Sequence, residues 1–170
     1  VHRMLVGSVA TKVATQAACP TFVVRDGAFN REGPITVGLG PEETSIYALE
    51  VGFQLAKAEG TSVHAVRAHQ HSAAGVSNIP EGQRKDWMVG EIEKSVDITR
   101  RYFDDVQARY PDVPGEFIHI QAHATDCLID AAVKSRLLIV APNGVSTTNR
   151  ALGSVALAVL HHAPAVLIAR

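Results

Sequence analysis

The chain has 170 residues, with 16 Lys and Arg against 17 Asp and Glu, and a formal net charge of −1. This near-neutral balance argues against a nucleic-acid or membrane partner held by electrostatic attraction. No apolar run reaches the roughly 18 residues that a membrane-spanning helix needs. The two cysteines, Cys19 and Cys127, lack metal-ligand spacing and fit a reducing compartment. We therefore expect a globular, cytoplasmic protein that binds neither nucleic acid nor a membrane.

The first 25 residues are predicted to form a helix followed by a strand. An Ala- and Val-rich stretch follows Gly7-Ser8 and is interrupted at Ala18-Cys19-Pro20, and residues 21–25 form a short apolar run of strand type. Residues 26–34 are rich in turn formers and show no periodicity, so we interpret them as a linker.

Strands and helices alternate from Ile35 onward. The predicted strands are residues 35–39, 62–68, 117–122, 137–141 and 165–169. The predicted helices are a segment that begins at a Thr44 or Ser45 cap and stops at Gly60, and residues 83–110, 126–134 and 153–162. This alternation predicts a doubly wound α/β fold with five parallel strands and helices on both faces. Ligands of such folds bind beyond the carboxyl ends of the strands, which points to residues 38–44 and 141–154.

The two ends of the chain repeat one another. Residues 7–25 read GSVATKVATQAACPTFVVR, and residues 153–170 read GSVALAVLHHAPAVLIAR. A chance similarity between two Ala-rich amphipathic segments is the alternative, but the shared Gly-Ser-Val-Ala start and the shared ending argue against it. We expect residues 1–25 to be the last helix and strand of a preceding domain, residues 26–34 a linker, and residues 35–170 a complete domain.

The last strand of each copy is an apolar sheet edge. Such an edge is a template for pairing with another strand. We predict that Thr21–Val24 and Ala165–Ala169 pair antiparallel, either within the chain or between the chains of a homodimer.

Three segments resemble the universal stress protein family. They are the repeated Gly-Ser-Val-Ala segment, the Leu-Leu-Ile-Val-Ala strand at residues 137–141, and the Ile-Thr-Val-Gly-Leu opening at residues 35–39. The resemblance implies a doubly wound domain with strand order 3-2-1-4-5 that commonly dimerises through its last strand. Tandem two-domain members are common, and many members bind ATP while others do not. It implies a stress-response regulator or sensor rather than a fast enzyme.

The family's ATP-binding pattern is Gly-x2-Gly-x9-Gly-(Ser/Thr) after the fourth strand, with an Asp at the end of the first strand. Glycines let the backbone approach phosphate oxygens, and a helix N-terminus adds N–H donors. The Asp accepts hydrogen bonds from ribose hydroxyls. The nucleotide-binding residues that the resemblance implies are Gly38, Leu39, Gly40, Val66, Val140, Ala141, Asn143, Gly144, Gly153, Ser154 and Val155.

This sequence keeps only part of that pattern. Ala141 stands at the first glycine, eight residues instead of nine separate Gly144 from Gly153, and Gly40 stands at the Asp position. The carboxylate can be replaced by Glu42 or Glu43, or its role taken by Thr44, although carboxylates near phosphates repel them. Asn149 and Arg150 could offset that repulsion. Two interpretations stay open: an ATP-binding domain, or a member that has lost nucleotide binding and acts as a dimerisation or adaptor module.

Other polar residues have simpler explanations. Gly153-Ser154 is equally consistent with a plain helix cap. His69 with His71, and His161 with His162, lack carboxylate or cysteine partners at ligand spacing, so we expect no metal site. No nucleophile–base pair and no Ser-Gly-Gly-x-Asp-Ser loop is present, which argues against an enzyme on a related nucleotide-hydrolysing fold.

Overall fold

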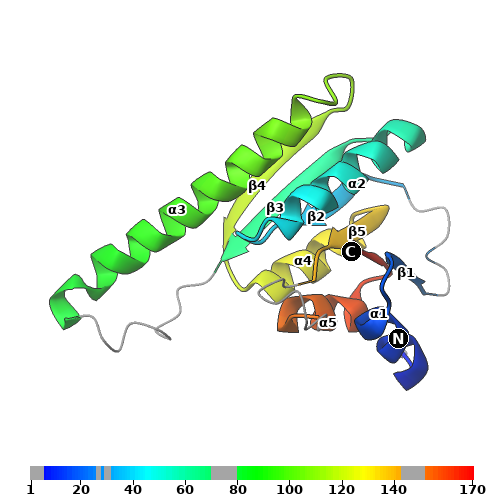
Figure 1. Ribbon diagram of the computed structural model, residues 1–170, viewed down its shortest axis with the longest axis horizontal. Helices are drawn as coiled ribbons and strands as arrows, with labels where there is room; N and C mark the ends of the chain where they lie inside the picture. Colours follow the sequence, from blue (N-terminus) through cyan, green and yellow to red (C-terminus); the bar gives the residue numbers. More distant parts are fainter. Residues whose placement is uncertain (1–5, 26–27, 29–31, 70–79, 143–151) are drawn as a thin grey trace.

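A computed structural model describes residues 6–25, 28, 32–69, 80–142 and 152–170 of the chain. Within these residues a six-stranded sheet carries helices on both faces (Figure 1). The strands are β1 Thr21–Val24, β2 Ile35–Gly38, β3 Val63–His69, β4 Gly115–Gln121, β5 Leu137–Val140 and β6 Ala165–Ile168. The helices are α1 Ser8–Gln16, α2 Thr44–Glu59, α3 Glu81–Gln107, α4 Ala124–Val133 and α5 Ser154–His162. The α/β class predicted from the alternating pattern is confirmed.

The strand order across the sheet is β1-β6-β5-β2-β3-β4. Strands β2 to β6 are all parallel to one another, and β1 pairs antiparallel with β6 at the edge of this parallel sheet. The expectation of a five-stranded sheet is therefore corrected to six strands. The reason is that an apolar edge with unpaired N–H and C=O groups accepts a further strand. The predicted pairing of Thr21–Val24 with the last strand is confirmed within the chain, with Phe22 opposite Leu167.

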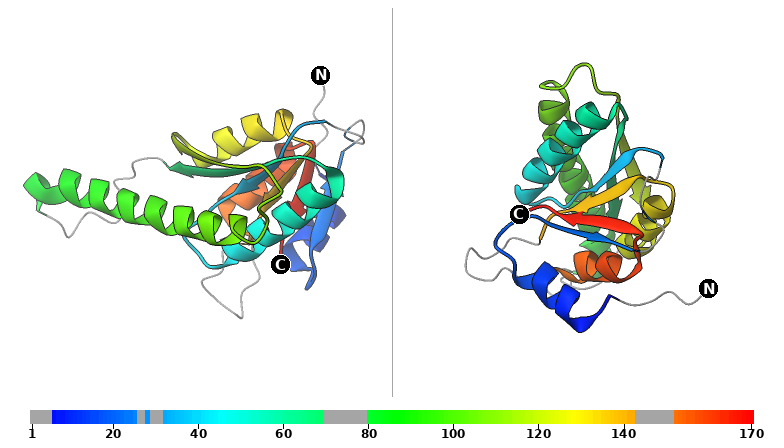
Figure 2. Two further views of the ribbon diagram at one scale, coloured as in Figure 1. Left: turned by 90° about the horizontal axis from the view of Figure 1, so that it is seen from above. Right: turned by 90° about the vertical axis from the view of Figure 1, so that its right-hand side faces the viewer.

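The two faces of the sheet carry different helices (Figure 2). The core between α2, α3 and the sheet is built around Phe53, Leu49 and Val37. The core of the opposite face joins α1, α4 and α5 to the sheet through residues such as Ala14, Leu128 and Val159. All four residues of β2 and of β5 are buried, because helices cover these central strands on both sides.

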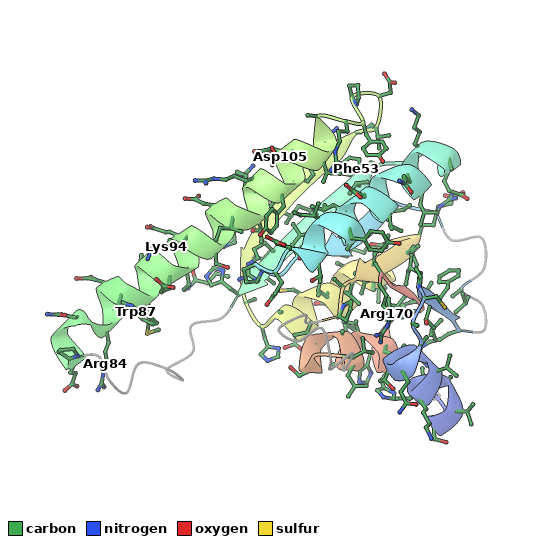
Figure 3. All side chains as sticks on the ribbon, in the orientation of Figure 1. Phe53, Arg84, Trp87, Lys94, Asp105 and Arg170 are labelled. Carbon is green, nitrogen blue, oxygen red and sulfur yellow. The ribbon has the colours of Figure 1, made fainter. Side chains whose placement is uncertain are left out.

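Helix α3 departs most from its predicted environment. Its buried residues are Thr99, Phe103 and Val106, all in the C-terminal part, and the N-terminal half extends beyond the sheet (Figure 1). Trp87 lies on this extended half and is 45% exposed (Figure 3). The apolar spacing of α3 therefore predicted the helix itself but not how much of it packs.

Of the two predictions for the ends of α2, one is confirmed and one is wrong. Gly60 ends the helix in the left-handed conformation (φ 64°), as predicted. The predicted cap at Thr44 or Ser45 is wrong, because Glu43 is the N-cap and no side chain caps the helix. Ser45 Oγ is instead engaged with the preceding turn, where it accepts a hydrogen bond from Gly40 N–H (3.0 Å) and donates one to Gly40 C=O (2.8 Å).

None of the helices in the described ranges is both long enough and apolar enough to cross a membrane.

Candidate functional site

A cavity of about 210 Å³ lies beyond the carboxyl ends of β2, β3 and β5. This is the place where doubly wound sheets hold ligands, because the strand order reverses there and loops diverge to opposite faces. The lining residues come from β2 and its following turn, β3, α4, β5 and α5: Gly38, Leu39, Gly40, Pro41, Glu42, Val66, Arg67, Ala68, Ala124, Leu128, Val140, Ala141, Val155 and Ala156.

Most residues proposed from the family resemblance meet at this cavity. Those in its lining are Gly38, Leu39, Gly40, Val66, Val140, Ala141 and Val155. Gly153 is the N-cap of α5 and Ser154 is its first residue, so both lie next to the lining without belonging to it. Asn143, Gly144, Asn149 and Arg150 lie outside the described residues.

At the end of β2, Gly38 lies in close contact with side chains of α4 and β5. A Cβ atom on Gly38 would lie 2.9 Å from Leu128 Cδ1 and 3.3 Å from Val140 Cγ1. The absence of a side chain lets α4 approach the sheet closely. The next residue continues the ladder, since Leu39 N–H donates to the Val66 carbonyl at 2.9 Å.

The Glu42 side chain folds back over Gly40. A Cβ atom on Gly40 would overlap Glu42 Oε2 and lie 3.3 Å from the Glu42 carboxylate carbon. The carboxylate of Glu42 therefore occupies the space into which a side chain at position 40 would extend. Of the three residues considered as substitutes, Glu42 alone lines the cavity. Glu43 is exposed, and the Thr44 hydroxyl donates to the Pro142 carbonyl at 3.4 Å.

Arg67 is the charged residue of the cavity that sequence reasoning missed. Its guanidinium donates to the Leu39 carbonyl from Nη1 (3.2 Å) and to Ser95 Oγ from Nη2 (2.5 Å). Its Nε atom is buried and has no hydrogen-bond partner among the described residues. The only available signal was a basic residue interrupting the apolar run of residues 63–68, which does not reveal that the residue lines a cavity.

The charges of Arg67 and Glu42 interact across the cavity lining. Burial lowers the pKa of the Arg67 guanidinium, and the negative charge of Glu42 offsets part of that effect. A cationic group beside the carboxylate makes the cavity compatible with an anionic ligand, which Glu42 alone would repel. Helix α5 adds to this effect, since Val155 and Ala156 of its first turn line the cavity and the N-terminus of a helix is the positive end of its dipole.

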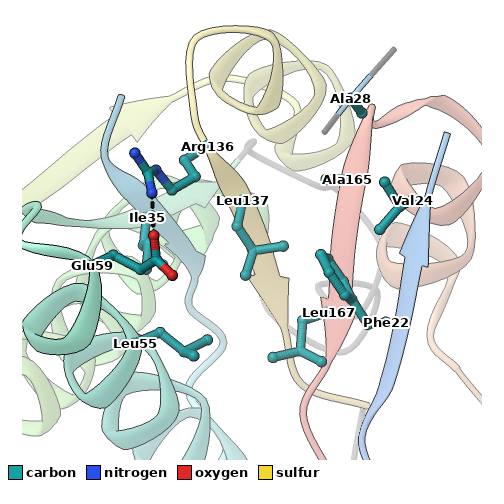
Figure 4. A pocket seen from close by; sticks show the side chains of 10 residues that line it. All are labelled: Phe22, Val24, Ala28, Ile35, Leu55, Glu59, Arg136, Leu137, Ala165 and Leu167. Carbon is teal, nitrogen blue, oxygen red and sulfur yellow. Dashed lines mark hydrogen bonds and ion pairs between the residues drawn. The ribbon is translucent and has the colours of Figure 1, made fainter. Parts of the chain in front are cut away.

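A second cavity, of about 430 Å³, lies at the opposite ends of the strands (Figure 4). Ile35, Leu137 and Ala165, the first residues of β2, β5 and β6, contribute to its lining. Arg136 and Glu59 form an ion pair at its side, and the remaining lining residues are apolar. It is larger than the first cavity, but its lining among the described residues includes no glycine and no residue from the first turn of a helix.

The described residues contain no cluster of three or more His, Cys, Asp or Glu side chains that could hold a metal ion. His119 Nε2 and His69 Nδ1 are 2.9 Å apart, and their rings stack with centroids 4.8 Å apart. This pair was not predicted, because it depends on the pairing of β3 with β4.

The sequence profile of the universal stress protein family matches residues 33–170. Universal stress protein Rv2005c of Mycobacterium tuberculosis (strain ATCC 25618 / H37Rv) is 30% identical over 174 residues, which cover 99% of this chain and 57% of that protein. The chain thus spans little more than half the length of the curated relatives that it matches.

Solved structures share the fold. Protein PA1789 from Pseudomonas aeruginosa PAO1, described as functionally unknown, has a TM-score of 0.67 at 14% identity, over 98% of this chain and 57% of that chain. UspA from Lactobacillus plantarum has a TM-score of 0.64 at 16% identity, over 82% of this chain and all of that chain.

Two further similar structures are nucleotide complexes. A universal stress protein in complex with cAMP has a TM-score of 0.52 at 22% identity, over 81% of this chain and 96% of that one. The protein from Archaeoglobus fulgidus in complex with dAMP has a TM-score of 0.53 at 17% identity, over 81% and 97%. The doubly wound sheet, the cavity at its carboxyl ends and the profile match over residues 33–170 together show that this chain belongs to the universal stress protein family.

Proposed function

We propose that the cavity beyond β2, β3 and β5 binds an adenine nucleotide, and that the domain acts as a nucleotide-responsive regulator in the cytoplasmic stress response rather than as an enzyme. The observation that carries this proposal is the position of the Glu42 carboxylate, which lies over Gly40 beyond the carboxyl end of β2. The residues proposed to contact the nucleotide are Gly38, Leu39, Gly40, Val66, Val140, Ala141, Asn143, Gly144, Gly153, Ser154 and Val155, to which we add Glu42 and Arg67.

Glu42 is proposed to hold the ribose. A carboxylate at the end of a central parallel strand accepts hydrogen bonds from ribose hydroxyls in other doubly wound nucleotide-binding folds. Gly40 has no side chain, which leaves room for the Glu42 carboxylate at that place. The bonds between Ser45 Oγ and the backbone of Gly40 hold the turn in the conformation that brings Glu42 over it.

Arg67 and the start of α5 are proposed to balance the nucleotide's charge. The buried Nε–H of Arg67 is a donor without a partner among the described residues, and such a donor gains stability when a ligand oxygen or nitrogen accepts from it. Gly153 and Ser154 offer backbone N–H groups at the helix start, the usual cradle for phosphate. The structures of similar proteins in complex with cAMP and with dAMP support an adenine nucleotide as the ligand class.

The test is a titration of the purified chain with ATP, AMP and cAMP by calorimetry, with CTP as a control for the base. Native mass spectrometry before titration detects nucleotide carried through purification. A ligand at one hundred times its dissociation constant adds about 2.7 kcal/mol to the free energy of unfolding. Absence of both heat and stabilisation at millimolar adenine nucleotide, with no nucleotide co-purified, would refute the proposal.

The second candidate function is a scaffold without nucleotide. Ala141 at the first glycine of the family pattern favours it, because that residue lines the cavity and its Cβ reduces the room for a phosphate. In this case the domain is a dimerisation or adaptor module, and the titration gives neither binding heat nor stabilisation.

The proposed domain organisation is tandem. Residues 1–25 are the last helix and strand of a preceding domain, residues 26–34 are a linker, and residues 35–170 are the second domain. Three observations support it: α1–β1 repeats the sequence of α5–β6, β1 pairs antiparallel with β6, and relatives matched over nearly the whole chain are much longer. The β1–β6 contact is then a pairing between domains, and a homodimer through the same strands is the alternative.

A further inference from the structure

Helix α1 and strand β1 expose three large apolar side chains, Val9, Val13 and Phe22. We infer that Val9 and Val13, together with the open edge of β1 that carries Phe22, form the docking surface for an upstream helix and strand of the same polypeptide, equivalent to α4 and β5. The inference rests on the proposed tandem organisation and not on the nucleotide site.

The internal repeat assigns a counterpart to each exposed residue. Aligning Gly7 with Gly153 places Val9 opposite Val155 and Val13 opposite Val159 in the two helices. The first copy has one extra residue before its strand, after which Phe22 aligns with Leu167 and Arg25 with Arg170. Phe22 and Leu167 are also direct cross-strand partners, so an approximate two-fold axis passes between them.

The counterparts differ in burial. Val13 is 53% exposed whereas Val159 is fully buried, and Val9 is 75% exposed whereas Val155 is half-buried. Phe22 is 58% exposed whereas Leu167 is half-buried. Each position is apolar in both copies, which a helix facing solvent on that side would not require.

The covering elements of the second copy explain the difference for the two helix residues. Val159 belongs to a cluster with Leu128 and Ala132 of α4 and with Leu138 and Val140 of β5. The described residues contain no equivalent of α4 or β5 next to α1, and β1 is the outermost strand of the described sheet. A unit equivalent to α4–β5 would add a strand to the open edge of β1 and lay its helix over Val9 and Val13.

The docking surface is held in a fixed orientation. All four residues of β1 are in register with β6, and Ala14 of α1 is fully buried. The guanidinium of Arg170 donates to the carbonyls of Ala14 (2.8 Å) and Thr15 (2.9 Å) at the end of α1. Helix α1 is therefore anchored on one side, while Val9 and Val13 remain on the other.

The length of the relatives favours an upstream segment over other occupants. The chain aligns with only 57% of the Mycobacterium tuberculosis protein, and the PA1789 chain is likewise covered to 57% although it accommodates 98% of this chain. A domain preceding α1 on the same polypeptide is tethered at the site it covers, which gives it a high effective concentration there.

The test compares thiol labelling in two polypeptides, the 170-residue chain and the full encoded protein. Val13→Cys is introduced in a Cys19→Ser background, since Cys19 is an exposed free thiol. Val133→Cys in the same background is the control, because Val133 is equally exposed (51%) on α4. We expect Val13→Cys to react at least tenfold more slowly in the full protein than in the 170-residue chain, and Val133→Cys to react equally fast in both.

Other outcomes overturn the inference. Equal labelling of Val13→Cys in both polypeptides means that the surface is free. Protection already in the 170-residue chain that rises with protein concentration means that a second copy covers it. A gene that encodes no domain before α1 refutes both the inference and the tandem organisation, whereas an encoded domain that leaves Val13→Cys unprotected refutes the docking surface alone.

Discussion

Arg25 and Arg170 each donate hydrogen bonds to the C-terminal end of the helix in the other copy of the internal repeat. Arg25, which follows β1, donates to the carbonyls of Leu160 (3.1 Å) and His161 at the end of α5, and from Nε to Ala163 (2.9 Å). Arg170, which follows β6, donates to Ala14 and Thr15 at the end of α1. In the internal repeat Ala14 corresponds to Leu160 and Thr15 to His161, so the two arginines make equivalent contacts across the β1–β6 seam. The repeat that is visible in the sequence is therefore also a repeat of interactions.

Replacing Arg25 should destabilise the chain. The guanidinium satisfies carbonyls that the end of α5 leaves without partners, and its charge complements the negative end of the helix. We expect Arg25→Ala to lower the free energy of unfolding by about 1–3 kcal/mol in chemical denaturation. Arg101→Ala, at an exposed position of α3, is the control and should have little effect. Equal stability of both variants would show that the capping bonds contribute nothing.

Glu42 and Glu43 form a matched pair for the nucleotide site. Both substitutions to Gln remove one negative charge from the same turn, but only Glu42 lines the cavity. If Glu42 accepts from the ribose hydroxyls, Glu42→Gln should weaken adenine-nucleotide binding by roughly 10-fold, the equivalent of one charge-assisted hydrogen bond. Calorimetric titration of both variants measures this. A loss of affinity in Glu43→Gln as large as in Glu42→Gln would contradict the assignment.

Two helical glycines should respond oppositely to alanine. A Cβ atom on Gly52 of α2 would lie 2.7 Å from Val37 Cγ2 in the buried strand β2, whereas one on Gly90 of α3 meets nothing within 4 Å. We expect Gly52→Ala to destabilise by about 1–3 kcal/mol through overpacking. Gly90→Ala should stabilise by about 0.5–1 kcal/mol through its higher helix propensity. Thermal unfolding of the two variants beside the unmodified chain measures both signs.

Cys127 should make stability depend on alkaline pH. Burial raises the pKa of the Cys127 thiol, and the charges of Asp130 and Asp126 raise it further. Because the folded pKa is higher than the unfolded one, this contribution is complete below the ordinary thiol pKa of 9.0 and is lost as pH rises through the folded pKa. Between pH 7 and 10, the free energy of unfolding should fall less steeply with pH for Cys127→Ala than for the unmodified chain. Parallel curves would show that the thiol titrates alike in both states.

Local features of the sequence were sufficient for much of the architecture. The apolar runs at residues 35–39 and 137–141 predicted strands β2 and β5, and Gly60 predicted the end of α2, because both depend on short-range backbone preferences and on periodicity. The similarity of residues 7–25 and 153–170 identified two equivalent edge strands and led to the prediction that they pair, which the β1–β6 ladder confirms. The carboxyl-end location of the cavity followed from the alternation of strands and helices.

Side-chain roles at the cavity depended on long-range neighbours. The sequence offered Glu42, Glu43 and Thr44 as equivalent candidates, and only the fold of the turn, held by Ser45, brings Glu42 over Gly40. Arg67 lines the cavity because β3 lies beside β2 and because α3 supplies Ser95 as an acceptor.

By itself, the sequence determined the fold class, the order of the elements, the internal repeat and the strands that pair at the seam, because these depend on periodicity and on residues close in the chain. Only the tertiary structure decided which carboxylate lines the cavity, that the half-buried Arg67 lies in the same lining, that half of α3 extends past the sheet, and that Val13 is exposed where Val159 is buried. These properties arise from contacts between segments far apart in the chain, and a side chain's environment there is set by the element that packs against it rather than by its own neighbours in sequence.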